Sequence, residues 1–335
     1  MHFKYRNIPF IYNLGDYYVT DHILVVSIAC YCFRLMWDKK HHLVYCPIYK
    51  VASGTWTTNF LRLSGFNSDL PKWQRFSKLH NASESVSRKM FPPPKGKKKQ
   101  METLKSSTKF LVVRHPFDRI ISAYKGKIAN PNAKPRFYRK LQKEIKAKYS
   151  KNKKEIAAEV PPSFAEYWEY LTDITEDLVN PKEWRDVDCV QSFYSVCIPC
   201  DVEYDVIIKL ETHDEDTEYL IRKYNLTELN EPFTMWKHNS KAENQIGDYD
   251  YYVYEDPRMN PIQITKSPKS DFSSLLATEI ESDGERKVNE KEKYKKDLFN
   301  QLTKKQIKKL YKNYKVDFDM FGYDINQFLE YAKEI

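Results

Sequence analysis

Three short apolar runs, each followed by a turn and an amphipathic stretch, constrain the fold of this chain more than any other feature. They are His42–Ile48, Phe110–Val113 and Tyr204–Leu210. Each run has the length of a buried strand, and a stretch of helical spacing comes after it. Because alternating strands and helices fold as a parallel sheet covered by helices, we predict an α/β fold with a central parallel sheet flanked by helices.

Helical periodicity supports the elements between the strands. Trp56, Phe60 and Leu63 are spaced i, i+4 and i+7, on one face of a helix that Gly65 can end. Ser163 is placed to cap a further helix, because a serine hydroxyl accepts a hydrogen bond from the first-turn N–H groups. A last, lysine-studded helix is predicted over residues 302–314.

The stretches between these elements are polar. Residues 72–109 are interpreted as a surface excursion with a mobile lysine tip, and residues 131–160 as a solvated face or a flexible insertion with helical patches such as 140–148. Residues 241–293 are acidic with few aliphatic side chains, which predicts a long loop or a disordered insertion. The main domain is therefore expected over residues 42–335, with residues 1–41 as a separate N-terminal segment.

The N-terminal segment contains one apolar run, Ile23–Phe33, of eleven residues. A membrane-spanning helix needs about 20 apolar residues, and the run lacks the small-residue cleavage site of a signal peptide. A buried helix or strand is the favoured interpretation, and a truncated or atypical signal anchor is the alternative. Truncation of the gene model upstream of Met1 would also explain so short a run.

Composition restricts the classes of ligand. The chain of 335 residues has a net charge of +9, which favours polyanionic partners such as nucleic acid, anionic lipid or acidic glycan without choosing among them. The lysine runs 95–99 and 140–148 are suited to steer an anionic glycan, although solvated charge explains such runs more often. The 8 glycines form no G-x-G-x-x-G and no Walker A motif, and the histidines form no H-E-x-x-H.

The six cysteines fit neither a zinc ribbon nor a dense disulfide scaffold. Cys197 and Cys200 form a C-x-x-C pattern that is compatible with redox activity, metal binding or a small structural disulfide. We favour a structural bridge between these two residues. Sequons at Asn81 and Asn225 are compatible with a secretory lumen.

The turn after the first strand has the composition of a phosphate site. A loop that leads from a strand into a helix offers unpaired backbone N–H groups and the positive end of the helix dipole. The loop Tyr49–Trp56 adds the cation of Lys50, the hydroxyls of Ser53 and Thr55, and Gly54, which lets the backbone approach a ligand. An ordinary turn with an exposed lysine is the alternative.

The turn after the second strand offers a second anion site. Arg114 follows the run Phe110–Val113, at the carboxyl edge where open α/β sheets bind their ligands. Ser122 lies eight residues further on, about two helical turns, so a guanidinium and a hydroxyl can face one crevice. A surface ion pair is the alternative for Arg114. Two anion sites on one sheet edge predict a ligand with phosphates at both ends.

These segments resemble those of a known family. Lys50–Trp56 (KVASGTW) resembles the 5′-phosphosulfate-binding loop of sulfotransferases, and Arg114–Tyr124 (RHPFDRIISAY) resembles their 3′-phosphate-binding motif. Downstream, a set of short motifs resembles the Golgi carbohydrate sulfotransferases of sulfotransferase family 2, which include the chondroitin and dermatan 4-sulfotransferases. The motifs are Cys197-Ile-Pro-Cys200, Tyr204-Asp205, Lys209-Leu-Glu211-Thr212, Leu310-Tyr311, Tyr314, Asp317-Phe318, Met320-Phe321 and Tyr323. The resemblance implies a P-loop-like three-layer fold.

The resemblance also implies transfer of a sulfuryl group from 3′-phosphoadenosine-5′-phosphosulfate to a sugar hydroxyl of a glycan or proteoglycan, without a metal. Lys50 is expected at the bridging oxygen and the 5′-phosphosulfate, and Arg114 and Ser122 at the 3′-phosphate. The residues assigned to the donor loop are Lys50, Val51, Ala52, Ser53, Gly54, Thr55 and Trp56. Of these, Trp56 is expected to pack in the core rather than to stack on adenine.

A histidine is the expected catalytic base, because imidazole titrates near neutral pH. His80 lies between the two phosphate motifs, in the region where related Golgi sulfotransferases place a histidine base, and is the first candidate. A surface histidine is the alternative there, and glycosylation of Asn81 would obstruct the role. His115 and His238 are lesser candidates.

Three functions stay open. The favoured one is an active carbohydrate sulfotransferase in the Golgi lumen, or a single-pass type II Golgi membrane protein if the N-terminus anchors the chain. The family usually has Pro before the loop lysine and Cys-Thr-Asn before the tryptophan, where this chain has Tyr49 and Ser53–Thr55. That departure motivates a catalytically silent, glycan-binding relative as the second function. A basic nucleic-acid binder is supported by net charge alone, so no nucleic-acid partner is expected.

Overall fold

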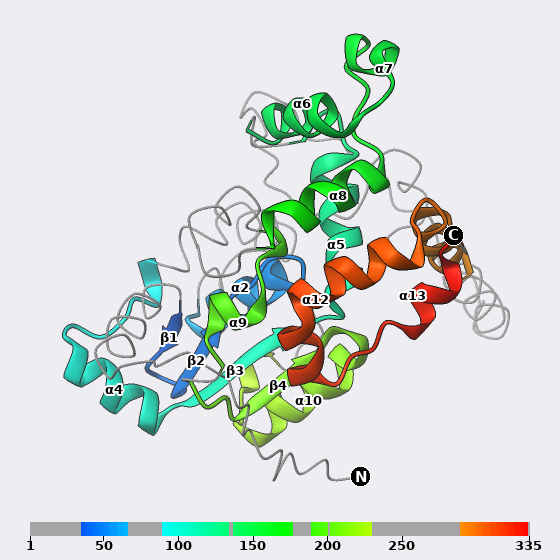
Figure 1. Cartoon of the computed structure of the whole chain (residues 1–335). Coiled ribbons are helices and arrows are strands. Elements are labelled where there is room, and N and C mark those ends of the chain that lie inside the picture. The colour runs from blue at the N-terminus through cyan, green and yellow to red at the C-terminus, as the bar shows by residue number, and fades with distance from the viewer. Residues whose placement is uncertain are drawn as a thin grey trace, which may run out of the picture.

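A computed structural model describes residues 35–65, 89–133, 137–176, 189–199, 202–229 and 289–333. Within these ranges, four strands form one open sheet in the order β1-β2-β3-β4 (Figure 1). The strands are Met36–Asp38 (β1), Leu43–Cys46 (β2), Thr108–Val113 (β3) and Val206–Lys209 (β4).

The pairing of the strands confirms the predicted sheet. β2 and β3 are parallel with Tyr45 opposite Phe110, and β3 and β4 are parallel with Val113 opposite Lys209. The three apolar runs of the sequence are therefore neighbouring parallel strands. β1 is an addition that the sequence analysis missed: it pairs with β2 in the antiparallel direction, and it lies within the segment 1–41 that was set apart from the domain.

Helices supply most of the rest of the described structure. They are α2 (Ser53–Leu63), α4 (Lys97–Ser106), α5 (Pro116–Ala123), α6 (Phe137–Tyr149), α7 (Lys153–Ala157), α8 (Phe164–Ile174), α9 (Phe193–Cys197), α10 (His213–Lys223), α12 (Lys304–Phe321) and α13 (Asn326–Tyr331). Shorter pieces are the π-helical turn η1 (Tyr124–Ile128) and the 3-10 turns η3 (Leu210–Thr212) and η4 (Thr227–Leu229). Residues 289–299 are also helical.

The two faces of the sheet are covered by different helices, which confirms the three-layer arrangement. On one face the Tyr45 ring stacks on Phe110 with 4.9 Å between centroids, and Trp56 of α2 meets Phe110 at 4.7 Å. Successive side chains of a strand point to opposite faces, so Cys46 points the other way. There it forms a disulfide with Cys197, which lies at the end of α9.

This disulfide corrects the predicted bridge between Cys197 and Cys200. Cys46 and Cys197 are bonded with their Cα atoms 6.0 Å apart, although 151 residues separate them in the chain. The C-x-x-C spacing suggested a local bridge, whereas the fold places the end of α9 against the end of β2 and so brings Cys46 within bonding distance of Cys197. Cys200 lies outside the described residues.

A second core lies beyond the sheet, where aromatic side chains of α5, α8, α12 and α13 meet. Phe117 is central to it, with centroid distances of 4.9 Å to Trp168, 5.0 Å to Phe318 and 5.3 Å to Phe328. Ser163 caps α8 as predicted, through a reciprocal capping box with Glu166. Because Phe117 belongs to α5, this core holds the helix that follows Arg114.

Two lysine-rich stretches are more ordered than predicted. Lys97–Lys99, expected at a mobile tip, begin helix α4, which buries Leu104. The stretch 131–160, expected to be a solvated face or a flexible insertion, contains α6, whose apolar face is buried. In α6, periodic apolar residues between the lysines account for the correction, because the apolar face of an amphipathic helix packs on a neighbouring element. In α4 only Leu104 is buried.

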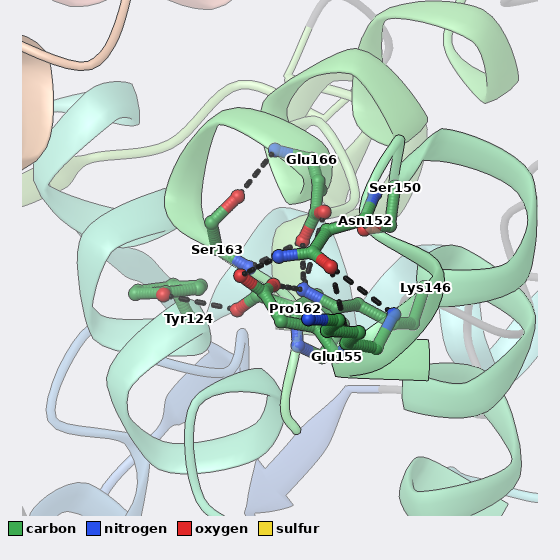
Figure 2. A network of polar contacts seen from close by, with 9 residues as sticks. Tyr124, Lys146, Ser150, Asn152, Glu155, Pro162, Ser163 and Glu166 are labelled. Carbon is green, nitrogen blue, oxygen red and sulfur yellow. Dashed lines mark hydrogen bonds and ion pairs between the residues drawn. The ribbon is translucent and has the colours of Figure 1, made fainter. Parts of the chain in front are cut away.

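One lysine of α6 is itself buried. Lys146 is 4% exposed, and its ammonium lies 2.6 Å from Glu155 and 3.1 Å from Glu166 (Figure 2). In the same network Tyr124, the last residue of the RHPFDRIISAY segment, donates from its hydroxyl to Pro162 O at 3.1 Å. The network therefore joins α6, α7 and the start of α8 to the end of α5.

Several sequence predictions fall outside the described residues. These are the apolar run 23–33, the candidate bases His80 and His238, the sequon at Asn81, and residues 241–288 of the predicted insertion. Residues 289–293, at the end of that insertion, belong to a helix. In the part of the chain that the structure describes, none of the helices has the length and apolarity to cross a membrane.

Candidate active site

The carboxyl ends of three parallel strands bring the predicted phosphate motifs together. Lys50 follows β2, Arg114 directly follows β3, and Lys209 is the last residue of β4. Nη1 of Arg114 donates a hydrogen bond to the backbone carbonyl of Lys50 at 3.3 Å. The two motifs are thus in direct contact at one edge of the sheet.

The loop that carries Lys50 has an unusual backbone. Lys50 has φ +68° and Ala52 has φ +60°, so two non-glycine residues within three positions are left-handed. This conformation costs an L-residue roughly 1–2 kcal/mol. Such residues persist where surrounding contacts hold them. Gly54 is not among the residues with positive φ, and its role in the close approach of a ligand stays a prediction.

The N-terminus of α2 is open to an anion. Its N-cap, Ala52, makes no side-chain capping hydrogen bond, and no acidic residue lies in the first turn. The first-turn N–H groups of Ser53, Gly54 and Thr55 and the positive end of the helix dipole therefore face the loop without a side-chain cap. This arrangement suits a phosphate or phosphosulfate group.

Two cations of different exposure accompany these N–H groups. Lys50 is only 3% exposed, whereas Arg114 is half-buried. An ammonium in such a low-dielectric setting attracts an anion more strongly than an exposed one. Arg114 offers further guanidinium N–H donors beyond the one that binds the Lys50 carbonyl.

Not every residue of the donor loop can present its side chain to a ligand. Trp56 and Val51 are both fully buried, and Trp56 lies against Tyr45 and Phe110. The prediction that Trp56 packs in the core is consistent with this burial. Val51 and Trp56 can therefore reach a donor only through their backbone.

Ser122, the second predicted 3′-phosphate residue, lies on α5 and is 7% exposed. Its place at the 3′-phosphate stays a prediction from the motif and the spacing.

The start of α5 differs from the start of α2, because His115 occupies it. Nδ1 of His115 accepts a hydrogen bond from the N–H of Phe117 at 3.1 Å, and Nε2 contacts the carbonyl of Asp324 at 2.8 Å. These partners require a neutral ring with its proton on Nε2. Burial lowers the pKa of His115, although Asp324, Asp118 and Glu211 oppose the shift. Both ring nitrogens bind backbone groups, so His115 acts as the N-cap of α5 in this structure.

Glu211 had no predicted function. It lies in η3, directly after β4, and connects this turn to His115 and Tyr323. Its carboxylate accepts from the N–H of His115 at 2.9 Å and from the hydroxyl of Tyr323 at 2.9 Å. The ammonium of Lys209 lies 4.8 Å from the centroid of the Tyr323 ring. The signal in the sequence was Lys209-Leu-Glu211-Thr212 itself, noted only as part of a resemblance.

Arg119 was also missed. Its Nε donates to the carbonyl of Tyr49 at 2.9 Å, and its Nη1 donates to the carbonyl of Gln191. The carboxylate of Asp317 on α12 interacts electrostatically with Arg119. It also accepts hydrogen bonds from the N–H groups of Phe193 at 2.9 Å and Tyr194 at 3.0 Å. The sequence did contain a signal for Arg119, because it lies among the apolar residues of the helix predicted after Arg114.

Burial shifts the pKa values of both Arg119 and Asp317, and neighbouring groups oppose these shifts. Burial lowers the pKa of Arg119 and raises the pKa of Asp317 to about 6, while the Phe193 and Tyr194 N–H groups and Arg119 oppose the shift of Asp317. In the ranges that the structure covers, no cluster of three or more His, Cys, Asp or Glu side chains could hold a metal ion.

Comparison with known proteins identifies a family for this chain. The sequence profile of the Sulfotransferase family matches residues 33–324, which is well over half of the chain. Carbohydrate sulfotransferase 12 of Xenopus laevis is 33% identical over 215 residues, covering 58% of this chain and 49% of the relative. Carbohydrate sulfotransferase 11 of Rattus norvegicus is 31% identical over 195 residues, covering 56% of this chain and 52% of the relative.

A longer match has lower identity. Carbohydrate sulfotransferase 10 of Xenopus laevis is 25% identical over 303 residues, covering 88% of this chain and 69% of the relative. The chain spans about half the length of the first two relatives. No solved structure shows a significant match. From the extent of the family match and the site at the sheet edge, we conclude that the chain belongs to the sulfotransferase family, alongside the carbohydrate sulfotransferases.

Proposed function

We propose that this protein transfers a sulfuryl group from 3′-phosphoadenosine-5′-phosphosulfate to a sugar hydroxyl of a glycan or proteoglycan. The observation that carries the proposal is the contact between Arg114 and the Lys50 carbonyl at 3.3 Å. It brings an uncapped helix start with a buried ammonium next to a guanidinium on the neighbouring strand. A ligand with phosphates at both ends needs two such anion sites side by side.

The two anion sites fit different ends of this donor. The N–H groups at the start of α2 and the ammonium of Lys50 suit the 5′-phosphosulfate. The start of α5 is filled by His115 and has Asp118 in its first turn. The 3′-phosphate would therefore depend on the guanidinium of Arg114 and the hydroxyl of Ser122 rather than on the α5 dipole.

The chemistry asks mainly for positioning and for charge neutralisation. In an in-line transfer, the acceptor oxygen bonds to sulfur as the bond from sulfur to the bridging phosphate oxygen breaks. Lys50 and the α2 N–H groups would neutralise the charge that develops on the departing phosphate oxygen. A base must take the acceptor proton, and His80 stays the proposed base. The fold commits His115 to its capping bonds and so favours a base elsewhere.

Location and acceptor follow the same proposal. The names of the relatives state that those proteins are carbohydrate sulfotransferases, which supports a glycan acceptor here. The disulfide between Cys46 and Cys197 is compatible with an oxidising compartment such as the Golgi lumen.

The test combines binding and transfer. The purified protein is passed over immobilised adenosine 3′,5′-bisphosphate, and radiolabelled sulfate transfer is then measured on a panel of glycans. Retention with transfer supports the proposal. Retention without transfer to any glycan would identify a catalytically silent relative, and absence of retention would overturn the donor assignment. The same assays applied to Lys50→Ala and Arg114→Ala need a control for general loss of positive charge. Lys105→Ala, which removes an exposed lysine of α4, is that control.

A further inference from the structure

Of the arginines in the described ranges, only Arg119 is buried, with 2% of its surface exposed. Burying a guanidinium costs several kcal/mol, on the order estimated for ions in protein interiors, unless its donors find acceptors. The hydrogen-bond acceptors of Arg119 therefore explain how a guanidinium can lie in the buried face of α5.

Two of the three guanidinium nitrogens of Arg119 bind backbone carbonyls, and Nη2 has no hydrogen-bond partner among the described residues. Nε binds the Tyr49 carbonyl at 2.9 Å, and Nη1 binds the carbonyl of Gln191, just before α9. The guanidinium carbon lies 4.9 Å from the centroid of the Phe193 ring, and Asp317 supplies the nearby negative charge. Arg119 thus joins the donor loop to α9 and α12 from the interior.

The two arginines of the segment Arg114–Tyr124 hold adjacent peptide groups. The Tyr49 carbonyl belongs to the peptide on the N-terminal side of Lys50, and Arg119 binds it. The Lys50 carbonyl belongs to the peptide on the C-terminal side, and Arg114 binds it. Fixing the planes of both peptides fixes φ and ψ of Lys50, and with them the direction of its Cα–Cβ bond.

We propose that Arg119 is a positioning residue for Lys50: through the Tyr49 carbonyl it maintains the left-handed conformation that directs the Lys50 ammonium to the donor. This inference rests on the proposed function for its effect on the donor, while its effect on the loop is independent of it. Nε and Nη1 of Arg119 are engaged by backbone carbonyls and its guanidinium lies against the Phe193 ring, so its influence on the donor passes through the backbone of the loop. Arg114, which is half-buried, can act on both the loop and the ligand.

The first experiment measures the loop directly in the intact protein. Arg119→Lys keeps the charge beside Asp317 but cannot reproduce the arginine fork. Amide hydrogen exchange over residues 49–54 is expected to rise by about tenfold in this variant, because local opening becomes easier. Exchange in α6 should stay at the wild-type level. Arg62→Lys is the matched control, since Arg62 also donates to a backbone carbonyl, that of Glu228 at 3.1 Å, but at the far end of α2.

The second experiment asks whether Arg119 acts through Lys50. The Kd of adenosine 3′,5′-bisphosphate is measured by calorimetry for wild type, Arg119→Lys, Lys50→Ala and the double variant. Arg119→Lys is expected to raise the Kd about tenfold, the scale of one hydrogen bond to a charged group. The double variant should bind within about twofold of Lys50→Ala alone, because residues that act in series are not additive.

The outcomes separate the two proposals. Additive effects in the double variant, or unchanged exchange over residues 49–54, would overturn the positioning role. An equal rise in exchange across the whole protein would also overturn it, since Arg119 would then only stabilise the fold. If the wild-type protein binds no bisphosphate, the donor assignment fails, and the exchange experiment alone still decides whether Arg119 orders the loop.

Discussion

The guanidinium of Arg114 donates to the backbone carbonyl of Lys50 across 3.3 Å, although the two residues are 64 positions apart. The contact exists because β2 and β3 are parallel neighbours, so the loops at their carboxyl ends leave the sheet side by side. Arg114 holds the loop backbone, and under the proposed function it also binds an anion. Its removal should disturb both.

We expect Arg114→Ala to lower transfer more than a single lost phosphate contact would, by about 100-fold or more. Lys50→Ala should lower transfer on the same scale, because the departing oxygen loses its neighbouring cation. Initial rates of radiolabelled sulfate transfer, with thermal melting to verify folding, provide the measurement. Turnover like that of wild type in either variant would contradict the assignment of these residues.

The capping role of His115 predicts a specific dependence of stability on pH. Its pKa is lowered in the folded protein by burial, so the unfolded chain takes up the proton first as pH falls through 6.5. The free energy of unfolding should therefore decrease below pH 6.5.

His115→Asn keeps an N-cap acceptor but does not titrate. The difference in unfolding free energy between wild type and this variant, measured by urea denaturation from pH 7.5 down to pH 5, should shift against wild type as the pH falls. Parallel pH profiles would show that His115 is not buried as a neutral cap.

The disulfide between Cys46 and Cys197 closes a long loop between β2 and α9. Replacing both cysteines with serine should lower the free energy of unfolding by about 2–5 kcal/mol. Peptide mapping without reduction should recover the Cys46–Cys197 pair. Recovery of a Cys197–Cys200 pair instead would restore the bridge that the local spacing suggested.

Lys146 lies between Glu155 and Glu166 in the network of Figure 2, and burial lowers its pKa less than these carboxylates raise it. Lys146→Met would leave the partly buried Glu166 without its cation and should destabilise the protein by about 3 kcal/mol. The exposed pair between Lys143 and Glu159 is the matched control, and Lys143→Met should cost about 1 kcal/mol or less. Equal melting temperatures for the two variants would contradict the structural role of Lys146.

The sequence by itself determined the features that depend on neighbouring residues. Apolar runs located β2, β3 and β4, and periodicity located α2 and α8, because strands and helices repeat over a few residues. The same local reasoning placed Lys50 and Arg114 at the ends of neighbouring strands. It also led to the error at Cys197, where nearness in the chain was taken for nearness in space.

Only the tertiary structure decided which groups meet across long separations. In the folded chain Cys197 is bonded to Cys46, and the ring of His115 contacts the carbonyl of Asp324. Arg119 donates to the carbonyl of Tyr49, the residue before Lys50. Such partners are backbone atoms or side chains from other elements, and no periodic pattern encodes them. They are set by how the sheet and the helices pack, because packing chooses the acceptors within reach of each buried donor.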